Sequence, residues 1–110
     1  MAVSNTDDHL RNHGFLLTGR GWELSPLYDV NPNIYGKTLS LNVDTGDNSI
    51  SFGLTLETAE YYGIGIRDAK NMLSEIKKTV SENWRGIAGN YGLSGVAADR
   101  MEPAFEMEYK

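Results

Sequence analysis

The sequence predicts an α+β domain in which short β-hairpins come first and three helices follow. In the first half of the chain, short apolar runs alternate and are separated by turns rich in glycine, asparagine and aspartate. From Thr55 onward, apolar residues instead recur every three or four positions, which is the period of an amphipathic helix. Strands and helices segregated in this way are typical of an α+β fold. The length of 110 residues is that of one domain.

The composition argues against several functional classes. The net charge is −5, whereas a protein that binds the phosphate backbone is usually basic, so we expect no direct contact with nucleic acid. Without cysteine, the chain can form neither disulfides nor a thiolate zinc site. No apolar run approaches the roughly 18 residues of a membrane span, and no signal-peptide pattern is visible at the N-terminus. We therefore expect a cytoplasmic protein with no membrane contact.

The first predicted hairpin lies between Asn12 and Asp29 and sets the spacing of these two polar residues. Residues 14–17 and 22–24 are apolar runs on either side of a turn that contains two glycines. Their alternation predicts that four large side chains face a core: Phe15, Leu17, Trp22 and Leu24. A possible second hairpin would pair residues 39–43 with Ile50 and Phe52.

Three helices are predicted after the hairpins. The first spans Thr55 to Tyr62, with Thr55 as its cap and Gly63 at its end. The second is the longest, at about 66–91, and its apolar stripe predicts a buried Trp84. The third covers about 96–101 after a Ser94 cap, and we expect Phe105 to dock back on the core. Residues 106–110 read as a polar tail.

The residues that indicate chemistry lie before and after the first hairpin. Asp7 and Asn12 are five positions apart, the spacing that separates the base from the metal-binding Asn in the catalytic loop of protein kinases. One irregular loop can hold both, because the base must sit beside the attacking oxygen while the metal ligand reaches the phosphates. A second metal carboxylate should then follow the hairpin, and Asp29 is the candidate. The sequence predicts that these three side chains converge.

These residues belong to two longer motifs. The stretch N-T-D-D-H-L-R-N-H at 5–13, followed by L-S-P-L-Y-D-V at 24–30, resembles the C-terminal kinase lobe of the HipA-like family of toxin kinases from bacterial toxin–antitoxin pairs. The resemblance runs from about Ser4 to Phe105. It implies a single domain over residues 1–110, part of a kinase-like C-terminal lobe. In it, 1–12 form the catalytic loop, 14–53 form hairpins and an activation-type segment, and 54–105 form helices.

The resemblance also implies roles and ligands. Asp7 would be the catalytic base of a serine/threonine kinase, and Asn12 and Asp29 would hold Mg²⁺ on the phosphates of ATP. Arg11 could contact a phosphate or simply be solvated. His9 and His13 have the spacing of half a zinc site, but a structural His9 that shapes the loop is favoured.

No glycine-rich phosphate loop is visible in the sequence. We therefore expect the nucleotide-binding lobe to be supplied by a missing N-terminal kinase part, and this chain alone to bind neither ATP nor Mg²⁺ tightly and to be inactive. The resemblance further implies a DNA-binding antitoxin as partner and a glutamyl-tRNA synthetase as protein substrate. Two alternatives stay open: a non-catalytic binding or regulatory module derived from a kinase lobe, and a fragment of a small-molecule phosphotransferase.

Overall fold

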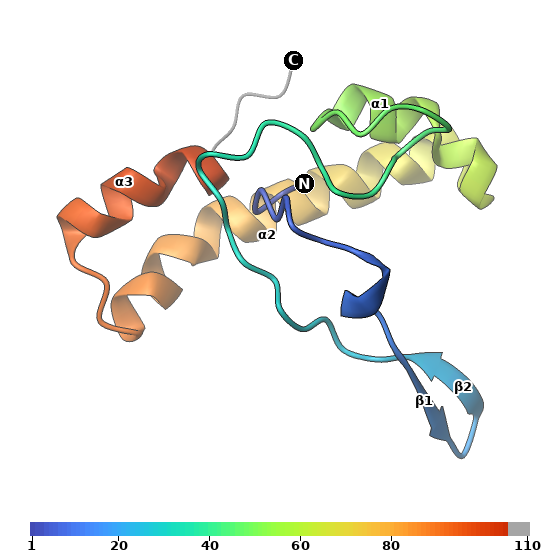
Figure 1. The fold of residues 1–110 in the computed structure, drawn as a ribbon, viewed down its shortest axis with the longest axis horizontal. Helices are drawn as coiled ribbons and strands as arrows, with labels where there is room; N and C mark the ends of the chain where they lie inside the picture. Colours follow the sequence, from blue (N-terminus) through green and yellow to red (C-terminus); the bar gives the residue numbers. More distant parts are fainter. Residues whose placement is uncertain (106–110) are drawn as a thin grey trace.

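The computed structural model describes residues 1–105 and confirms the α+β fold class. A hairpin of β1 (Phe15–Thr18) and β2 (Gly21–Leu24) comes first. The helices α1 (Phe52–Glu57), α2 (Ile66–Asn90) and α3 (Gly95–Phe105) follow. Figure 1 shows α2 as the long axis of the helical part, with α1 against its first half, α3 against its second half, and the hairpin extending away from all three.

The hairpin forms where it was predicted, but its expected burial is wrong. β1 and β2 pair antiparallel, with Phe15 opposite Leu24 and Leu17 opposite Trp22. These four side chains share one face, as the alternation indicated, yet each is 59–73% exposed. The period of a strand shows which side chains share a face, but it cannot show whether anything packs against that face. In the described residues the hairpin projects beyond the helices, so its apolar face has no covering layer.

The second hairpin does not form a ladder of strands. Two isolated antiparallel bridges, Thr38 with Ser49 and Asp44 with Asp47, close this stretch into a loop. The side chain and backbone of Ser49 donate hydrogen bonds to Asp47 and lower the pKa of its carboxyl group. Side-chain bonds of this kind offer the backbone an alternative to strand pairing. The segment between the hairpin and α1 is therefore a long loop that runs back across the N-terminus (Figure 1).

The first predicted helix begins earlier and is divided. Ser51 is the cap of α1, because its hydroxyl accepts the Leu54 N–H at 3.2 Å, and Thr55 lies inside the helix. A short 3₁₀ helix, η2 (Ala59–Tyr62), follows. Gly63 ends it with a φ of 72°, the left-handed conformation that favours glycine, as predicted.

Helices α2 and α3 enclose a small aromatic core. Trp84 is buried, at 5% exposure, and its ring stacks on that of Phe105 at 4.5 Å between centroids. The burial of Trp84 and the docking of Phe105 are therefore confirmed. Ser94 caps α3 through a 3.3 Å bond from Ala97 N–H, but the helix continues past residue 101, with Pro103 inside it.

An ion-pair cluster joins the two helices on their outer side. The Arg85 guanidinium pairs with Asp99 at 3.0 Å and with Glu102 at 2.7 Å, and it lies over the Trp84 ring. The hydrogen bonds that Arg85 donates to Asp99 and to Glu102 raise the pKa of its guanidinium. None of the helices over residues 1–105 has the length and apolarity needed to cross a membrane. The predicted polar tail, 106–110, lies outside the described residues.

Candidate functional site

The base of the hairpin brings the two ends of the candidate site together. Asn12 is the last residue of a short 3₁₀ helix, η1 (Leu10–Asn12), directly before β1, and Asp29 follows β2. Beyond the last pair of strand residues, the Ser25 N–H donates to the Gly14 carbonyl oxygen at 2.8 Å. This bond extends the antiparallel pairing by one position beyond Phe15 and Leu24. The segment that leaves β2 therefore returns to η1.

Asn12 and Asp29 are in direct contact. Asn12 Nδ2 donates to Asp29 Oδ2 at 3.0 Å, while Asn12 Oδ1 accepts the His9 backbone N–H at 3.1 Å. Asn12 is only 7% exposed, so its amide is fixed in this orientation. Two of the three residues that the sequence predicted to converge therefore lie side by side, with the amide nitrogen of Asn12 facing Asp29 and its amide oxygen facing the His9 N–H.

Asp29 has an unusual backbone, and a residue that sequence reasoning missed contacts it. Its φ is 56°, in the left-handed region that few non-glycine residues adopt. Asn31 Nδ2 donates to Asp29 Oδ1 at 2.7 Å, so each carboxylate oxygen accepts one amide N–H. A conformation of this kind persists when its surroundings determine it, and it is found most often at functional sites. The sequence signal for Asn31 was weak, because an asparagine in a loop is ordinary.

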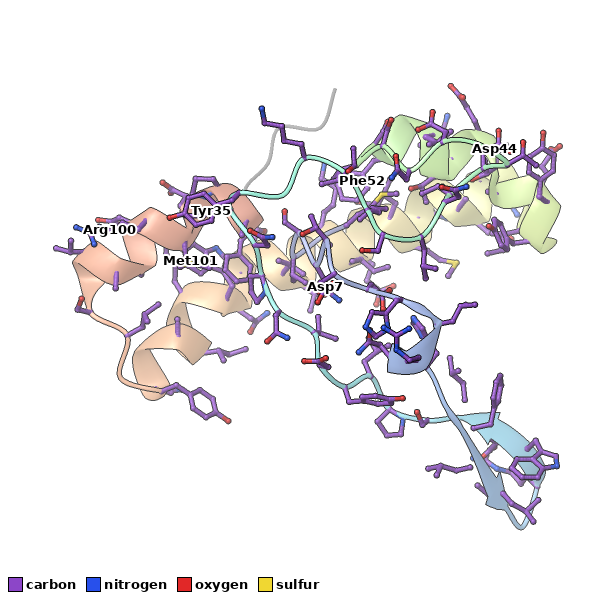
Figure 2. All side chains as sticks on the ribbon, viewed as in Figure 1. Asp7, Tyr35, Asp44, Phe52, Arg100 and Met101 are labelled. Atoms are coloured by element: carbon purple, nitrogen blue, oxygen red, sulfur yellow. The ribbon has the colours of Figure 1, made fainter. Side chains whose placement is uncertain are left out.

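Asp7 lies at an exposed turn that follows a buried segment. Asn5 and Thr6 are each 8% exposed, and the Thr6 carbonyl oxygen accepts both the backbone N–H and the hydroxyl of Ser40, at 3.1 and 2.8 Å. Asp7 itself is exposed, and its carboxylate makes no hydrogen bond or ion pair with the described residues. Figure 2 shows it near the middle of the molecule, beside the helical part. Its carboxylate is thus open to a group that arrives from outside, while no hydrogen bond within residues 1–105 joins it to Asn12 or Asp29.

Arg11 contributes its backbone to the arrangement. The Tyr28 hydroxyl donates to the Arg11 carbonyl oxygen at 2.8 Å and so ties the residue before Asp29 to the residue before Asn12. The Arg11 side chain is exposed and forms no ion pair within residues 1–105. Its guanidinium can therefore meet an external anion.

A comparison with protein families identifies the chain. The model described as "HipA-like C-terminal domain" matches residues 1–84, which includes the candidate site and most of α2. The chain belongs to the HipA-like C-terminal domain family. The match ends at Trp84, earlier than the resemblance from the motifs suggested, so α3 lies outside it. No curated protein and no solved structure matches the chain significantly.

In this HipA-like domain, the histidines near the loop act in different ways. His13 Nε2 lies 2.9 Å from Asp8 Oδ1, which links the end of η1 to the turn before it. His9 shapes the loop through its backbone N–H, which Asn12 Oδ1 accepts, while its buried ring Nδ1 has no hydrogen-bond partner among residues 1–105. No group of three or more histidine and acidic side chains that could hold a metal occurs in the described part of the chain. The described geometry thus gives the zinc alternative no complete ligand set.

Behind the loop of the HipA-like domain is a cavity of about 220 Å³. Asp8, Asn12 and His13 of the loop line it, together with Met1. Burial lowers the pKa of the Met1 amino group, and the nearby Asp8 carboxylate opposes that shift. The cavity therefore lies directly beneath the residues that position the candidate site.

Proposed function

We propose that this domain is the catalytic-loop part of a HipA-like serine/threonine protein kinase, which transfers the γ-phosphoryl group of ATP to a protein hydroxyl. The observation that carries the proposal is the contact between Asn12 and Asp29 across the hairpin, with an exposed Asp7 carboxylate five residues before Asn12. Phosphoryl transfer depends chiefly on positioning and electrostatic stabilisation, so residue placement is the relevant evidence.

Each side chain has a role that its surroundings permit. Asp7 is the base that orients the substrate hydroxyl and accepts its proton, and its exposure lets a protein substrate reach it. Asn12 and Asp29 are metal ligands held on a common floor by the hairpin. Arg11, whose guanidinium is exposed, contacts a phosphate.

The residues present fit a magnesium ion that is shared with a nucleotide. The donor set would be the Asp29 carboxylate and the Asn12 amide oxygen, which accepts the His9 N–H and keeps a second lone pair. Mg²⁺ prefers such oxygen ligands. Each Asp29 oxygen accepts one amide N–H and keeps capacity for another partner. One or two carboxylates together with substrate phosphates form the usual magnesium site. The bound ion would offset the negative charge of the phosphates.

The remaining parts of the reaction belong to other polypeptide segments. A nucleotide-binding part must grip the adenine and cover the phosphates, and the proposal assigns that task to a segment outside these 110 residues. By family resemblance, the protein substrate is a glutamyl-tRNA synthetase and the regulator is a DNA-binding antitoxin. Such an ATP-dependent reaction would take place in the cytoplasm.

The first prediction tests the need for that second part. The 110-residue chain with Mg²⁺ should show no ATP binding in calorimetry and no phosphate transfer. Losing the positioning of two reactants costs about 7–11 kcal/mol of barrier lowering, which corresponds to roughly five to eight powers of ten in rate. Adding a HipA-like nucleotide-binding part, fused or as a second chain, should restore both binding and transfer.

Asp7→Asn in the restored kinase should abolish transfer while ATP still binds and the fold is kept. Asp68→Asn, at an exposed position near the start of α2, is the control and should leave transfer unchanged. If the restored protein binds ATP but Asp7→Asn transfers phosphate at the wild-type rate, Asp7 is not the base. If no nucleotide-binding part restores ATP binding, the alternative of a non-catalytic binding module is favoured, because the exposed apolar hairpin face would then serve a partner alone.

A further inference from the structure

The Asp29 carboxylate is held by two amides on different oxygens. Asn12 Nδ2 bonds to Oδ2 at 3.0 Å, and Asn31 Nδ2 bonds to Oδ1 at 2.7 Å. A single hydrogen bond would leave the carboxylate free to turn about its Cβ–Cγ bond, whereas one bond to each oxygen fixes its plane. The bond from Asn31 is the shorter of the two, and bonds to an ionised acceptor are about twice as strong as neutral ones.

Asn31 also supports the unusual backbone of Asp29. The same Nδ2 lies 3.3 Å from the Asp29 carbonyl oxygen, so one side-chain amide spans the backbone and side chain of the residue two positions before it. Within residues 1–105, Asp29 and Ser4 are the two non-glycine residues with positive φ. Left-handed backbone at a non-glycine residue is strained, and local side-chain bonds offset that strain.

Asn31 is anchored in turn to the segment that carries Asp7. Its backbone N–H points at Asn5 Oδ1 at 3.4 Å, and Asn5 is 8% exposed. The chain of contacts from Asn5 through Asn31 and Asp29 to Asn12 therefore joins the start of the catalytic loop to its end by way of the metal carboxylate.

We propose that Asn31 is a positioning residue, which sets the orientation of the Asp29 carboxylate toward the metal ion. The inference rests on the proposed function, because it assigns Asp29 as a metal ligand. Partners that orient a metal ligand are commonly worth about 10–100-fold in metal affinity. Asn31 would act only through Asp29, since its amide is engaged there on both the carboxylate and the carbonyl oxygen.

The chain offers a matched control two residues further on. Asn33 lies in the same loop and is equally bonded: its Nδ2 donates to Thr6 Oγ1 at 2.8 Å, and its Oδ1 accepts the Tyr35 N–H at 2.8 Å. It ties the loop to the N-terminal segment, but no bond joins it to Asp29. Asn31→Ala and Asn33→Ala thus remove the same chemical group from one loop, and only the first should disturb the carboxylate.

The first test needs neither metal nor ATP. In the 110-residue chain, the side-chain amide protons of Asn12 should resonate downfield in NMR spectra and exchange slowly, because they bond to Asp29. In Asn31→Ala and in the isosteric Asn31→Asp, which replaces the donor with a like charge, these signals should move to solvated positions and exchange faster. Asn33→Ala should leave them in place. An unchanged Asn12 signal in both Asn31 variants, or no shifted signal in the wild-type chain, would overturn the proposal.

The second test uses the kinase restored with its nucleotide-binding part. Asn31→Asp should raise the Mg²⁺ concentration for half-maximal transfer by about 10–100-fold, with activity recovered at high Mg²⁺, while Asn33→Ala should not. An equal loss at all Mg²⁺ concentrations would overturn the proposal in favour of a purely structural role. The two inferences can fail separately: if the Asn12 signal responds to Asn31 but wild-type transfer needs no Mg²⁺, the proposed function is wrong and the positioning of Asp29 stands.

Discussion

Trp84 is the residue on which the packing of the helical part depends most. Its side chain is 5% exposed and its ring stacks on that of Phe105. The Arg85 guanidinium lies over the Trp84 ring as well, 4.5 Å from its centroid. The other buried apolar residues over 1–105 are Phe52 and three alanines, all of them smaller. Removing this ring would leave a cavity that α2 and α3 cannot close without moving.

We predict that Trp84→Ala lowers the free energy of unfolding by about 3–5 kcal/mol. A small domain has roughly 5–15 kcal/mol in total, so the variant should melt far below the wild type or be largely unfolded. Thermal unfolding followed by circular dichroism measures this loss. The protein has two tryptophans, and Trp22→Ala is the matched control. Trp22 is 73% exposed, so its loss should change the melting temperature little, and equal effects of the two substitutions would contradict the packing.

The sequence predicted single residues unevenly, and the reason differs for each. Trp84 was predictable because it recurs on a helical stripe, and the contact of Asn12 with Asp29 was predictable because a hairpin returns the chain to its start. Asn31 was not, because its role depends on the left-handed backbone of Asp29. Aspartate tolerates the left-handed conformation but also adopts others, so the neighbouring residues do not predict which conformation Asp29 takes.

The loop between β2 and α1 is the element that covers the N-terminal segment carrying Asp7. Figure 2 shows Tyr35 of this loop near Met101 of α3, and Asp44 at the far end near η2. At Gly36 the loop lies directly against Thr6: an added Cβ would lie 2.7 Å from Thr6 Cβ and closer still to the atoms beyond it. Backbone and side chain here touch too closely for any larger residue.

We predict that Gly36→Ala destabilises the domain by about 1–3 kcal/mol, the usual cost of overpacking. The loop would have to move away from Thr6 and break the bond from Asn33, which amide chemical shifts of residues 5–7 would report. Gly46→Ala in the same loop meets nothing within 4 Å and should leave both melting temperature and spectra near those of the wild type. A wild-type melting curve for Gly36→Ala would show that the loop does not rest on Thr6.

The elements themselves were predicted best where one signal dominated. The 3.6-residue period gave α2 within a residue of its observed end, and a glycine in the left-handed conformation ended η2 as expected. The start of α1 was missed because Ser51 and Thr55 are both good caps, and the choice depends on which hydroxyl reaches a free N–H. The loop at 38–51 was read as strands because alternation does not reveal side-chain bonds that close turns.

The molecule as a whole exposes more surface than its size warrants. Its accessible area is 8111 Å² for 12.2 kDa, whereas a compact monomer of that mass exposes about 6,100 Å². Its radius of gyration is 15.4 Å, against about 13 Å for a compact domain of this length. An open apolar groove of about 570 Å³ between α1 and α2 adds to the exposed hairpin face. This excess is more than the roughly 800 Å² that one partner buries in a standard protein interface.

The last prediction follows from the hairpin face. A large exposed apolar patch promotes association. The isolated 110-residue chain should therefore bind a hydrophobic dye such as ANS, and in sedimentation its average mass should increase with protein concentration. Leu17→Ser combined with Trp22→Ser should reduce dye binding and shift the chain toward the monomer. Because both side chains are about 70% exposed and surface substitutions usually change stability by only about 0.5 kcal/mol, the melting temperature should stay nearly constant. A collapse of the melting temperature in this double variant would mean that the hairpin packs against the helices in solution, and the open arrangement of the domain would then be wrong.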